Sequence, residues 1–531
     1  MPSKNYHHIS DLSLFLRVQS VCAGAIYQGY CMAELLFTGA YILSKNDIEI
    51  FDMSDPSKPE TKTAHYLPLL IGPIICVSGF IVSYFIPLFT TKIERRQCMI
   101  ISDLIFLIAT IFTQLPTWEL FMISRLLMGV TCAIDLVVTP LYIREISPDN
   151  MAGKTGCIFQ ANIFIGAILA FLLQIPVDDF ESNDQPIGNK WRIVFVFPAI
   201  LSIIRIISIL VFYKIDTPYH YYRQGNQDQG KQALQQIYQE KYVHHFVQQH
   251  QKPSSIDVPD HQAIHKRKLA EQQALQSETE QKTFNPDIQQ KVEIIKQYEH
   301  SYKNRLRVGL VVNFCQQMTG CTALTGLSSV VIGLISSNYE TKRCIILGTY
   351  FFLLFVAVLG VAFNRKLARK KYLVGGFLLC SLFQFVLAII SSFKSTLKEN
   401  ITLEFVFLLF IFFFYAAYNF TVGPVTVILT TDILKDRGLS YSIMANWLGI
   451  FFSFILLINP YQYINHIIYG SFAFIGFLFS INYIVETRWL NFSNIQELYK
   501  DIQKDQHERI YNEQLTLHNN VELQQLITVN V

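Results

Sequence analysis

Residues 119–148 read ELFMISRLLMGVTCAIDLVVTPLYIREISP. The part up to residue 143 is mostly apolar, and it exceeds the roughly 20 residues that a helix needs to cross a bilayer. A short segment, residues 144–148, follows this run; it begins with the charged pair Arg144-Glu145 and ends at Pro148. The stretch therefore predicts a membrane-spanning helix that leads into a charged loop.

Eleven further apolar runs of similar length lie outside this stretch, so that six fall in each half of the chain. The twelve runs cover about residues 15–42, 66–90, 97–115, 119–143, 155–175, 192–213, 305–336, 343–363, 372–393, 402–431, 439–459 and 464–485. We expect an all-α membrane protein in which twelve transmembrane helices form two six-helix bundles. The expected domains are an N-terminal tail (1–14), a first bundle (15–213), a helical linker (214–304), a second bundle (305–486) and a C-terminal tail (487–531).

Composition agrees with a membrane protein. The 531 residues are 51% hydrophobic and only 16% charged, against roughly 25% charged residues in a typical soluble domain. A net charge of +3 gives no support for nucleic-acid binding. The ten cysteines contain no C-x-x-C pair, which argues against a disulfide framework or a zinc site. Neither a nucleotide-binding loop nor a nucleophile elbow is present, so we expect no enzyme activity, no metal and no cofactor.

The loops differ in charge on the two sides of the predicted bundles. Lys and Arg residues gather after the second, fourth, eighth and tenth runs, on the side that also holds the linker and both tails: Lys92, Arg95, Arg96, Arg144, Lys154, Arg365, Lys366, Arg369, Lys370, Lys371, Lys435 and Arg437. The positive-inside rule places this side in the cytosol. We expect a multi-pass protein of the plasma membrane or an organelle membrane, with both termini on the cytosolic side.

Short motifs narrow the class further. In chain order they are Arg125-x-x-x-Gly129, Pro140-x-Tyr142-x-x-Glu145-x-x-Pro148, Trp191-Arg192, Gln316-Gln317-x-Thr319-Gly320, Gly423-Pro424, Asn446-Trp447 and Glu486-Thr487-Arg488. Their order and spacing resemble those of the sugar porters of the major facilitator superfamily. The resemblance implies the major facilitator fold and a carrier, most simply a facilitative one, that moves a hexose or similar small polyol by alternating access.

Amide side chains in the apolar runs are the candidate sugar ligands. A sugar is a ring of hydroxyl groups, and Gln and Asn can both donate and accept hydrogen bonds without carrying charge. Asn313, Gln316 and Gln317 share one helical face because they stand at i, i+3 and i+4. The resemblance adds three further candidates: Gln160, Asn446 and Thr322. The alternative is that these groups bond one another and hold the helices together.

Gly423-Pro424 lies within the tenth run and removes a side chain and then a backbone donor. Such a break lets a membrane helix bend as a gate, although a static kink is the alternative. Val427 stands where the family has a Trp that stacks on sugar, and Tyr415 and Tyr418 could supply rings instead.

Charged residues at the inner ends predict a salt-bridge network that closes that side. The resemblance points to Arg95, Arg96, Glu145, Asp216, Arg369, Asp432 and Arg437. Several family charges are missing, among them the Arg replaced by Tyr219. We therefore expect a thinned network.

Two carboxylates within the apolar runs, Asp135 and Glu34, are considered for a functional role. Asp135 is a candidate proton site, and the alternative is an ion pair with Arg125 or with another helix. Glu34 is expected at a solvated outer mouth. Proton-driven family members have an Asp where this chain has Cys31, which favours facilitative transport.

A second function class remains open. The missing inner-end charges and aromatic rings also fit a transporter fold that no longer transports. Such a protein would serve as a structural or sensing subunit of a larger membrane assembly. The polar linker and C-terminal tail are the candidate surfaces for protein partners, beside the sugar and the lipid bilayer.

Overall fold

The computed structural model describes residues 11–34, 67–115, 117–148, 151–175, 191–238, 243, 286–326, 339–363, 368–393, 401–457, 461–488, 490 and 492–500. In the first half the helices are α1 (Asp11–Val21), α2 (Ala23–Ala33), α4 (Leu67–Thr90), α5 (Arg95–Thr113), α6 (Trp118–Ile146), α7 (Ala152–Gln174) and α8 (Trp191–Val211). Two short helices follow, α9 (Pro218–Arg223) and α10 (Gln227–Gln235).

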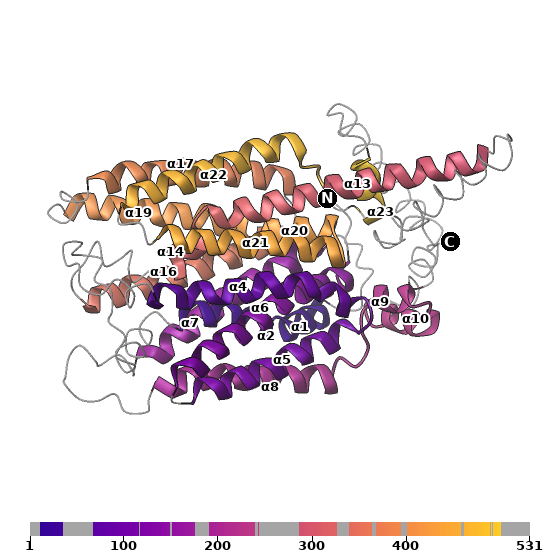
Figure 1. The fold of residues 1–531 in the computed structure, drawn as a ribbon, viewed down its shortest axis with the longest axis horizontal. Coiled ribbons are helices and arrows are strands. Elements are labelled where there is room, and N and C mark those ends of the chain that lie inside the picture. Colours follow the sequence, from indigo (N-terminus) through magenta and orange to yellow (C-terminus); the bar gives the residue numbers. More distant parts are fainter. Residues whose placement is uncertain are drawn as a thin grey trace.

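The second half is built in the same way. Its helices are α13 (Pro286–Met318), α14 (Cys321–Gly326), α16 (Tyr339–Phe363), α17 (Arg369–Ser392), α19 (Ile401–Ala417), the π-helix η2 (Tyr418–Val422), α20 (Gly423–Ile433), α21 (Asp436–Leu456), α22 (Gln462–Tyr483) and α23 (Phe492–Leu498). The two halves lie side by side with their helices roughly parallel, as Figure 1 shows. They meet where α4 packs on α21 and where α7 packs on α16 and α20.

Ten of the described helical segments are long and apolar enough to cross a membrane. They match ten of the twelve predicted runs. The run at 15–42 is instead divided into α1 and α2, and residues 35–42 lie outside the described part of the chain. The run at 305–336 comprises the end of α13 and all of α14, and residues 327–336 are likewise outside it. The expected linker boundary at residue 305 falls inside α13.

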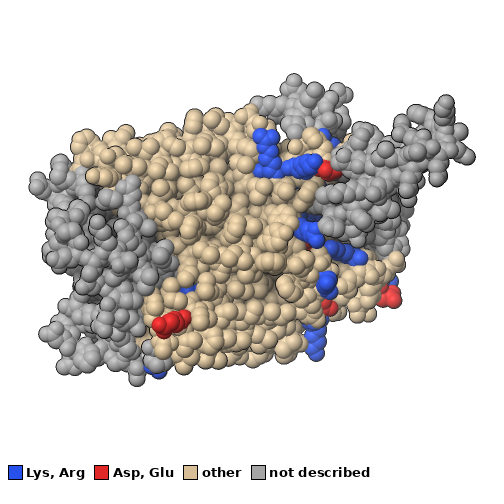
Figure 2. All heavy atoms as spheres, in the orientation of Figure 1, with Lys and Arg blue, Asp and Glu red and all other residues tan. Residues whose placement is uncertain are grey.

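The surface reflects this membrane class. On the face seen in Figure 2, a broad band without visible Lys, Arg, Asp or Glu crosses the middle of the molecule. Most of the Lys and Arg visible there gather at the end where α9, α10 and α23 lie (Figures 1 and 2). We call this the inner end. Aliphatic and aromatic side chains such as Phe89, Ile111 and Phe355 are more than half exposed in the absence of a membrane.

Two helix breaks shape the centre of the molecule. Gly320 adopts φ +83°, a left-handed conformation that ends α13 and lets α14 start in a new direction. In the second break, the N–H of Gly423 donates to the carbonyl of Tyr418, five residues earlier, because the chain widens into a π-turn there. Pro424, which has no N–H, follows at once. Such π-turns within α-helices are often found at functional sites.

Candidate functional site

A cavity of about 100 Å³ lies between the two halves, large enough for several water molecules. It is lined by Gln28, Gly29, Met32, Ala33, Leu136, Phe159, Gln160, Ile163, Phe164, Ala167, Gln316, Gln317, Cys321, Thr322, Thr325, Tyr350, Tyr418, Asn419, Val427, Asn446 and Ile450. No Asp, Glu, Lys, Arg or His is among these described lining residues. The cavity therefore suits an uncharged polar molecule.

One wall of the cavity is a chain of amides. Asn446 Nδ2 donates to Gln316 Oε1 at 3.2 Å, and Gln316 Nε2 donates to the carbonyl of Gly423 at 3.0 Å. Asn446 is buried, and its Oδ1 accepts no hydrogen bond from any described residue. A buried acceptor without a donor costs about 1–3 kcal/mol, so this atom favours a hydroxyl group in the cavity.

Two further amide contacts complete the polar lining. Thr322 Oγ1 donates to Gln317 Oε1 at 2.5 Å. Gln160 Nε2, from α7, lies 3.5 Å from Asn419 Oδ1 of η2 and so joins the two halves across the cavity. Because this contact is at the long end of the hydrogen-bond range, a solute hydroxyl could replace either partner.

Aromatic rings supply the apolar part of the lining. Phe159, Phe164, Tyr350 and Tyr418 line the cavity, although the family's Trp position is Val427. Of the two tyrosines suggested by the sequence, Tyr418 is among the lining residues and Tyr415 is not. Ring faces are thus available for the small apolar faces of a sugar.

The structure brings five of the six predicted ligands to this cavity: Gln160, Gln316, Gln317, Thr322 and Asn446. Asn313 does not line it; its Oδ1 lies 3.5 Å from Asn446 Nδ2, behind the wall. The sequence reasoning missed Gln28 and Asn419. Asn419 stands four residues before Gly423, about one helical turn from the Gly-Pro break. This closeness to the break was the signal that the sequence offered.

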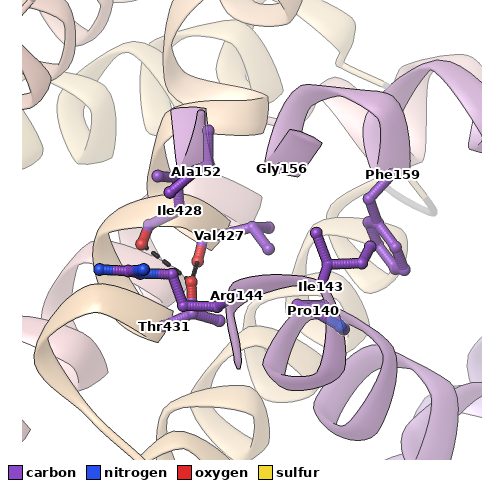
Figure 3. A pocket seen from close by; sticks show the side chains of 9 residues that line it. All are labelled: Pro140, Ile143, Arg144, Ala152, Gly156, Phe159, Val427, Ile428 and Thr431. Atoms are coloured by element: carbon purple, nitrogen blue, oxygen red, sulfur yellow. Dashed lines mark hydrogen bonds between the residues drawn. The ribbon is translucent and has the colours of Figure 1, made fainter. Parts of the chain in front are cut away.

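The cavity is closed toward the inner end. Phe159 and Val427 line both the cavity and a second gap of only about 10 Å³ (Figure 3). They therefore form the wall between the two. Next to them α7 and α20 touch so closely that a Cβ on Gly156 would lie 2.6 Å from Ile428 Cγ1. We call Gly156, Phe159, Val427 and Ile428 the inner constriction.

Ion pairs join the halves beyond this constriction. Arg144 of α6 lies 2.7 Å from Asp432 of α20, which Arg369 also approaches at 3.7 Å. Arg95 of α5 lies 3.2 Å from Glu145 and 2.8 Å from Asp436.

Arg96 and Arg437 do not take part in these bonds between the halves. Arg96 instead pairs with Glu94 of its own half at 2.9 Å, and Arg437 forms no ion pair with a described residue. The sequence reasoning missed Arg144, Arg223 and Asp436, because the partners of these residues depend on how the helices pack.

Asp216 lies in the loop before α9 and accepts a hydrogen bond from the backbone N–H of Arg95 at 2.7 Å. Burial raises the pKa of the Asp216 carboxyl from 3.8 to about 7, and the nearby Arg95 opposes this rise. Burial likewise lowers the pKa of His220 in α9.

The two candidate membrane carboxylates, Asp135 and Glu34, are both paired. Asp135 accepts hydrogen bonds from Arg205 Nη1 at 2.8 Å and Nη2 at 3.1 Å, and from Ser102 at 2.9 Å. Its partner is thus on α8 and is not Arg125. The expectation that Glu34 lies at a solvated mouth is wrong, because its side chain is fully buried and pairs with Arg125. Neither carboxylate lines the cavity.

Comparison with known proteins agrees with this geometry. The family model described as "Sugar (and other) transporter" matches residues 19–499. The chain belongs to this family. Its members are transport proteins rather than enzymes, and the chain is accordingly an integral multi-pass membrane protein.

Several relatives are recognisable at low identity. Hexose transporter 1 of Plasmodium knowlesi is 23% identical over 427 residues, which cover 77% of each chain. Solute carrier family 2, facilitated glucose transporter member 3 of Mus musculus is 21% identical and covers 80% of this chain and 81% of its own.

Among solved structures, the proton:xylose symporter XylE bound to 6-bromo-6-deoxy-D-glucose superposes with a TM-score of 0.72 at 17% identity. The match covers 92% of this chain and 100% of that one. The inward-open form of XylE from E. coli gives a TM-score of 0.61, also at 17% identity, and covers 91% of this chain and 99% of that one. These matches identify the major facilitator fold.

Proposed function

We propose that this protein carries a hexose or a similar small polyol across a membrane, by facilitative transport through alternating access. The observation that carries the proposal is the cavity between the halves, lined by amides and rings and by no charged residue among those described. The Oδ1 of Asn446 and the long Gln160–Asn419 contact are the two places where sugar hydroxyls would bind. Gln316, Gln317 and Thr322 complete the proposed ligand set, and Asn313 orients Asn446.

The proposed cycle follows from the way the halves meet. The inner constriction and the ion pairs Arg144–Asp432 and Arg95–Asp436 close the inner end, so the state described here has its cavity shut on that side. Rocking of the halves would break these contacts and open the cavity inward. The π-turn at η2 followed by Gly423-Pro424 would absorb the bend in the α19–α20 segment.

The names of the relatives support a hexose. The Plasmodium knowlesi relative is a hexose transporter, and the Mus musculus relative is a facilitated glucose transporter. XylE, by contrast, is a proton:xylose symporter, so fold similarity alone leaves the energy source open.

Two features favour the facilitative mode. The candidate proton site Asp135 receives four hydrogen bonds, two from Arg205 and one each from Ser102 and Thr139, and it lies outside the cavity lining. The α2 position where proton-driven members have an Asp is Cys31. We therefore assign Asp135 a structural role.

Topology is part of the same proposal. The basic inner end would face the cytosol, together with the linker and both tails, in the plasma membrane or an organelle membrane. The linker and the C-terminal tail are the proposed sites for any protein partner.

Saturable uptake of radiolabelled hexose by proteoliposomes tests the proposal. We expect uptake that competing unlabelled hexose blocks, that a protonophore leaves unchanged, and that Gln316→Ala/Gln317→Ala reduces strongly. The control is Gln114→Ala, at the end of α5 and away from the cavity. Uptake that does not saturate, and that the double variant leaves unchanged, would favour the transport-deficient subunit. Sizing after gentle extraction would then show the protein in a larger assembly rather than dispersed.

A further inference from the structure

Three charged residues meet in the interior of the first bundle, and none of them lines the cavity. Arg205 of α8 lies 2.9 Å from Asp103 of α5 and 2.8 Å from Asp135 of α6. All three side chains are at most 2% exposed. Among the described residues, Arg205 is the one cation paired with either carboxylate. Two carboxylates and one guanidinium would leave this cluster with a buried negative charge that nothing balances.

The five N–H groups of Arg205 are all used. Nη1 and Nη2 donate to the two oxygens of Asp135 at 2.8 and 3.1 Å. They also donate to the carbonyls of Val21 and Met99, both at 3.4 Å. Only Nε remains for Asp103, at 2.9 Å from Oδ2 and 3.1 Å from Oδ1. The guanidinium therefore makes a two-pronged contact with Asp135, the stronger arrangement, and gives Asp103 a single N–H.

The two carboxyl groups differ in how many protons they receive. Asp135 accepts four hydrogen bonds, two from Arg205 and two from hydroxyl groups, and such donors favour the ionised form. Asp103 has only the Arg205 Nε–H and a contact of 3.1 Å between its Oδ1 and the hydroxyl oxygen of Tyr27. Either oxygen of that contact can supply the proton. Of the two carboxyl groups, Asp103 is thus the one that can accommodate a proton.

A fully buried hydroxyl near Tyr27 lacks a partner. Ser202 stands three residues before Arg205 on α8 and so lies on the same helix face. Its Oγ is close to the Tyr27 hydroxyl, yet it makes no hydrogen bond with a described residue. If Asp103 carries a proton and donates it to Tyr27, the Tyr27 O–H can turn to Ser202. The unpartnered Ser202 Oγ then gains a donor.

The backbone of α2 packs tightly against the cluster. A Cβ added to Gly24 would lie 2.4 Å from Arg205 Nη1 and 2.4 Å from Asp135 Cγ. The Arg205 guanidinium also lies over the Tyr27 ring of α2, 5.2 Å from its centroid. A metal ion with its water or ligands needs more room than a Cβ, whereas a proton needs none. The packing on this side therefore favours a proton as the balancing charge.

We propose that Asp103 holds a resident proton, so that Arg205, Asp135 and Asp103 form a neutral, occluded tie between α2, α5, α6 and α8. An unbalanced charge in an apolar interior is costly, and such a group commonly neutralises by taking up a proton. The charged and titratable groups facing Asp103 are Arg205, Asp135 and Tyr27, while Cys22 lies beside Arg205 and Asp135. Because the cluster lies outside the cavity lining, Asp103 is a positioning residue, and its proton is not one that accompanies a solute.

Infrared spectroscopy of the full-length protein tests for this proton directly, because a protonated carboxyl and a carboxylate have separate C=O stretching bands. The protein is kept in a detergent without ester groups at about pH 9, where solvated carboxyls and Asp216 are ionised. We expect a protonated-carboxyl band in the parent protein and its loss in Asp103→Asn, which keeps the shape and hydrogen bonds of the neutral acid. Asp228→Asn, at an exposed site on α10, is the matched control and should leave the band unchanged.

Isotope labelling keeps the test decisive if Asp103→Asn fails to fold. In the parent protein grown with aspartate labelled with heavy carbon, the band should shift to lower frequency. In heavy water it should shift only slowly, because the buried proton exchanges when the bundle opens. Asp135→Asn should also remove the band, since Arg205 would then pair with an ionised Asp103. Absence of the band from the parent, its persistence in either variant, or immediate exchange in heavy water would overturn the proposal.

Discussion

Replacing Gly156 by alanine tests whether the inner constriction controls the transport cycle. The added Cβ would lie 2.6 Å from Ile428 Cγ1 and 3.2 Å from its Cδ1. Ordinary carbon contacts begin near about 3.5 Å, so α7 and α20 would have to separate by about 1 Å at this point. Overpacking of this kind costs about 1–3 kcal/mol. In the proposed cycle the cost falls on the inner-closed state alone, because the two helices would part when the cavity opens inward.

A penalty of that size shifts the balance between the two states about 5- to 150-fold toward the inner-open one. Hydrogen exchange at the start of α7 and the end of α20 should rise by a corresponding factor. Ile428→Ala in the same chain removes the clash and should restore slow exchange. Gly348→Ala, on α16 with nothing within 4 Å of the added Cβ, is the matched control.

Inner-end exchange that stays as slow in Gly156→Ala as in the parent protein would refute this role of the constriction. So would an effect that the added Ile428→Ala change does not reverse, because it would then arise elsewhere than at this contact.

Three further predictions concern the cavity, the hinge and the inner loop. Asn446→Leu removes the unpaired Oδ1 acceptor and the hydrogen bond that Nδ2 donates to Gln316, so hexose affinity by calorimetry should fall on the order of ten- to a hundredfold; unchanged affinity would place the sugar elsewhere. Gly423→Ala puts a Cβ 3.1 Å from the Tyr418 ring, and we expect a lower maximal uptake rate with unaltered hexose affinity. An equal loss of uptake rate and of hexose affinity would indicate damage to the sugar site itself. Burial raises the pKa of the Asp216 carboxyl from 3.8 to about 7. The inner-closed state therefore binds a proton on Asp216 more tightly than a state in which water surrounds the loop before α9. Closure should therefore be favoured most in acid and weaken as pH rises from about 4 to about 7, as followed by inner-end exchange, and Asp216→Asn should remove this dependence.

Apolar run length predicted most of the fold. Ten runs became membrane-length helices, since an apolar stretch of 20 residues has few alternatives to a helix in a bilayer. The break at Cys22 between α1 and α2 was not predicted, because the segment stays apolar across it. There Arg205 from α8 donates to the carbonyl of Val21 at 3.4 Å, a contact that depends on the tertiary fold.

The polar wall of the cavity could be predicted from the sequence better than the ion pairs, which lie elsewhere in the molecule. Gln316 and Gln317 carry a local signal, since amides in an apolar run need partners or a cavity. Arg95 and Arg205 carry no signal for their partners, because helix packing sets each partner and brings it from 50 or more residues away in the sequence. Glu34 illustrates the same limit: its position near a run end suggested solvent, and only the packing of Arg125 against it explains its burial.

Counterflow of labelled hexose in proteoliposomes preloaded with the unlabelled sugar is the decisive measurement for facilitative alternating access. Facilitative alternating access predicts a transient accumulation of label with no ion gradient, which a protonophore leaves intact and which Asn446→Leu diminishes. A cooperatively folded protein that shows no counterflow with any hexose or small polyol would rule out facilitative carriage by this chain.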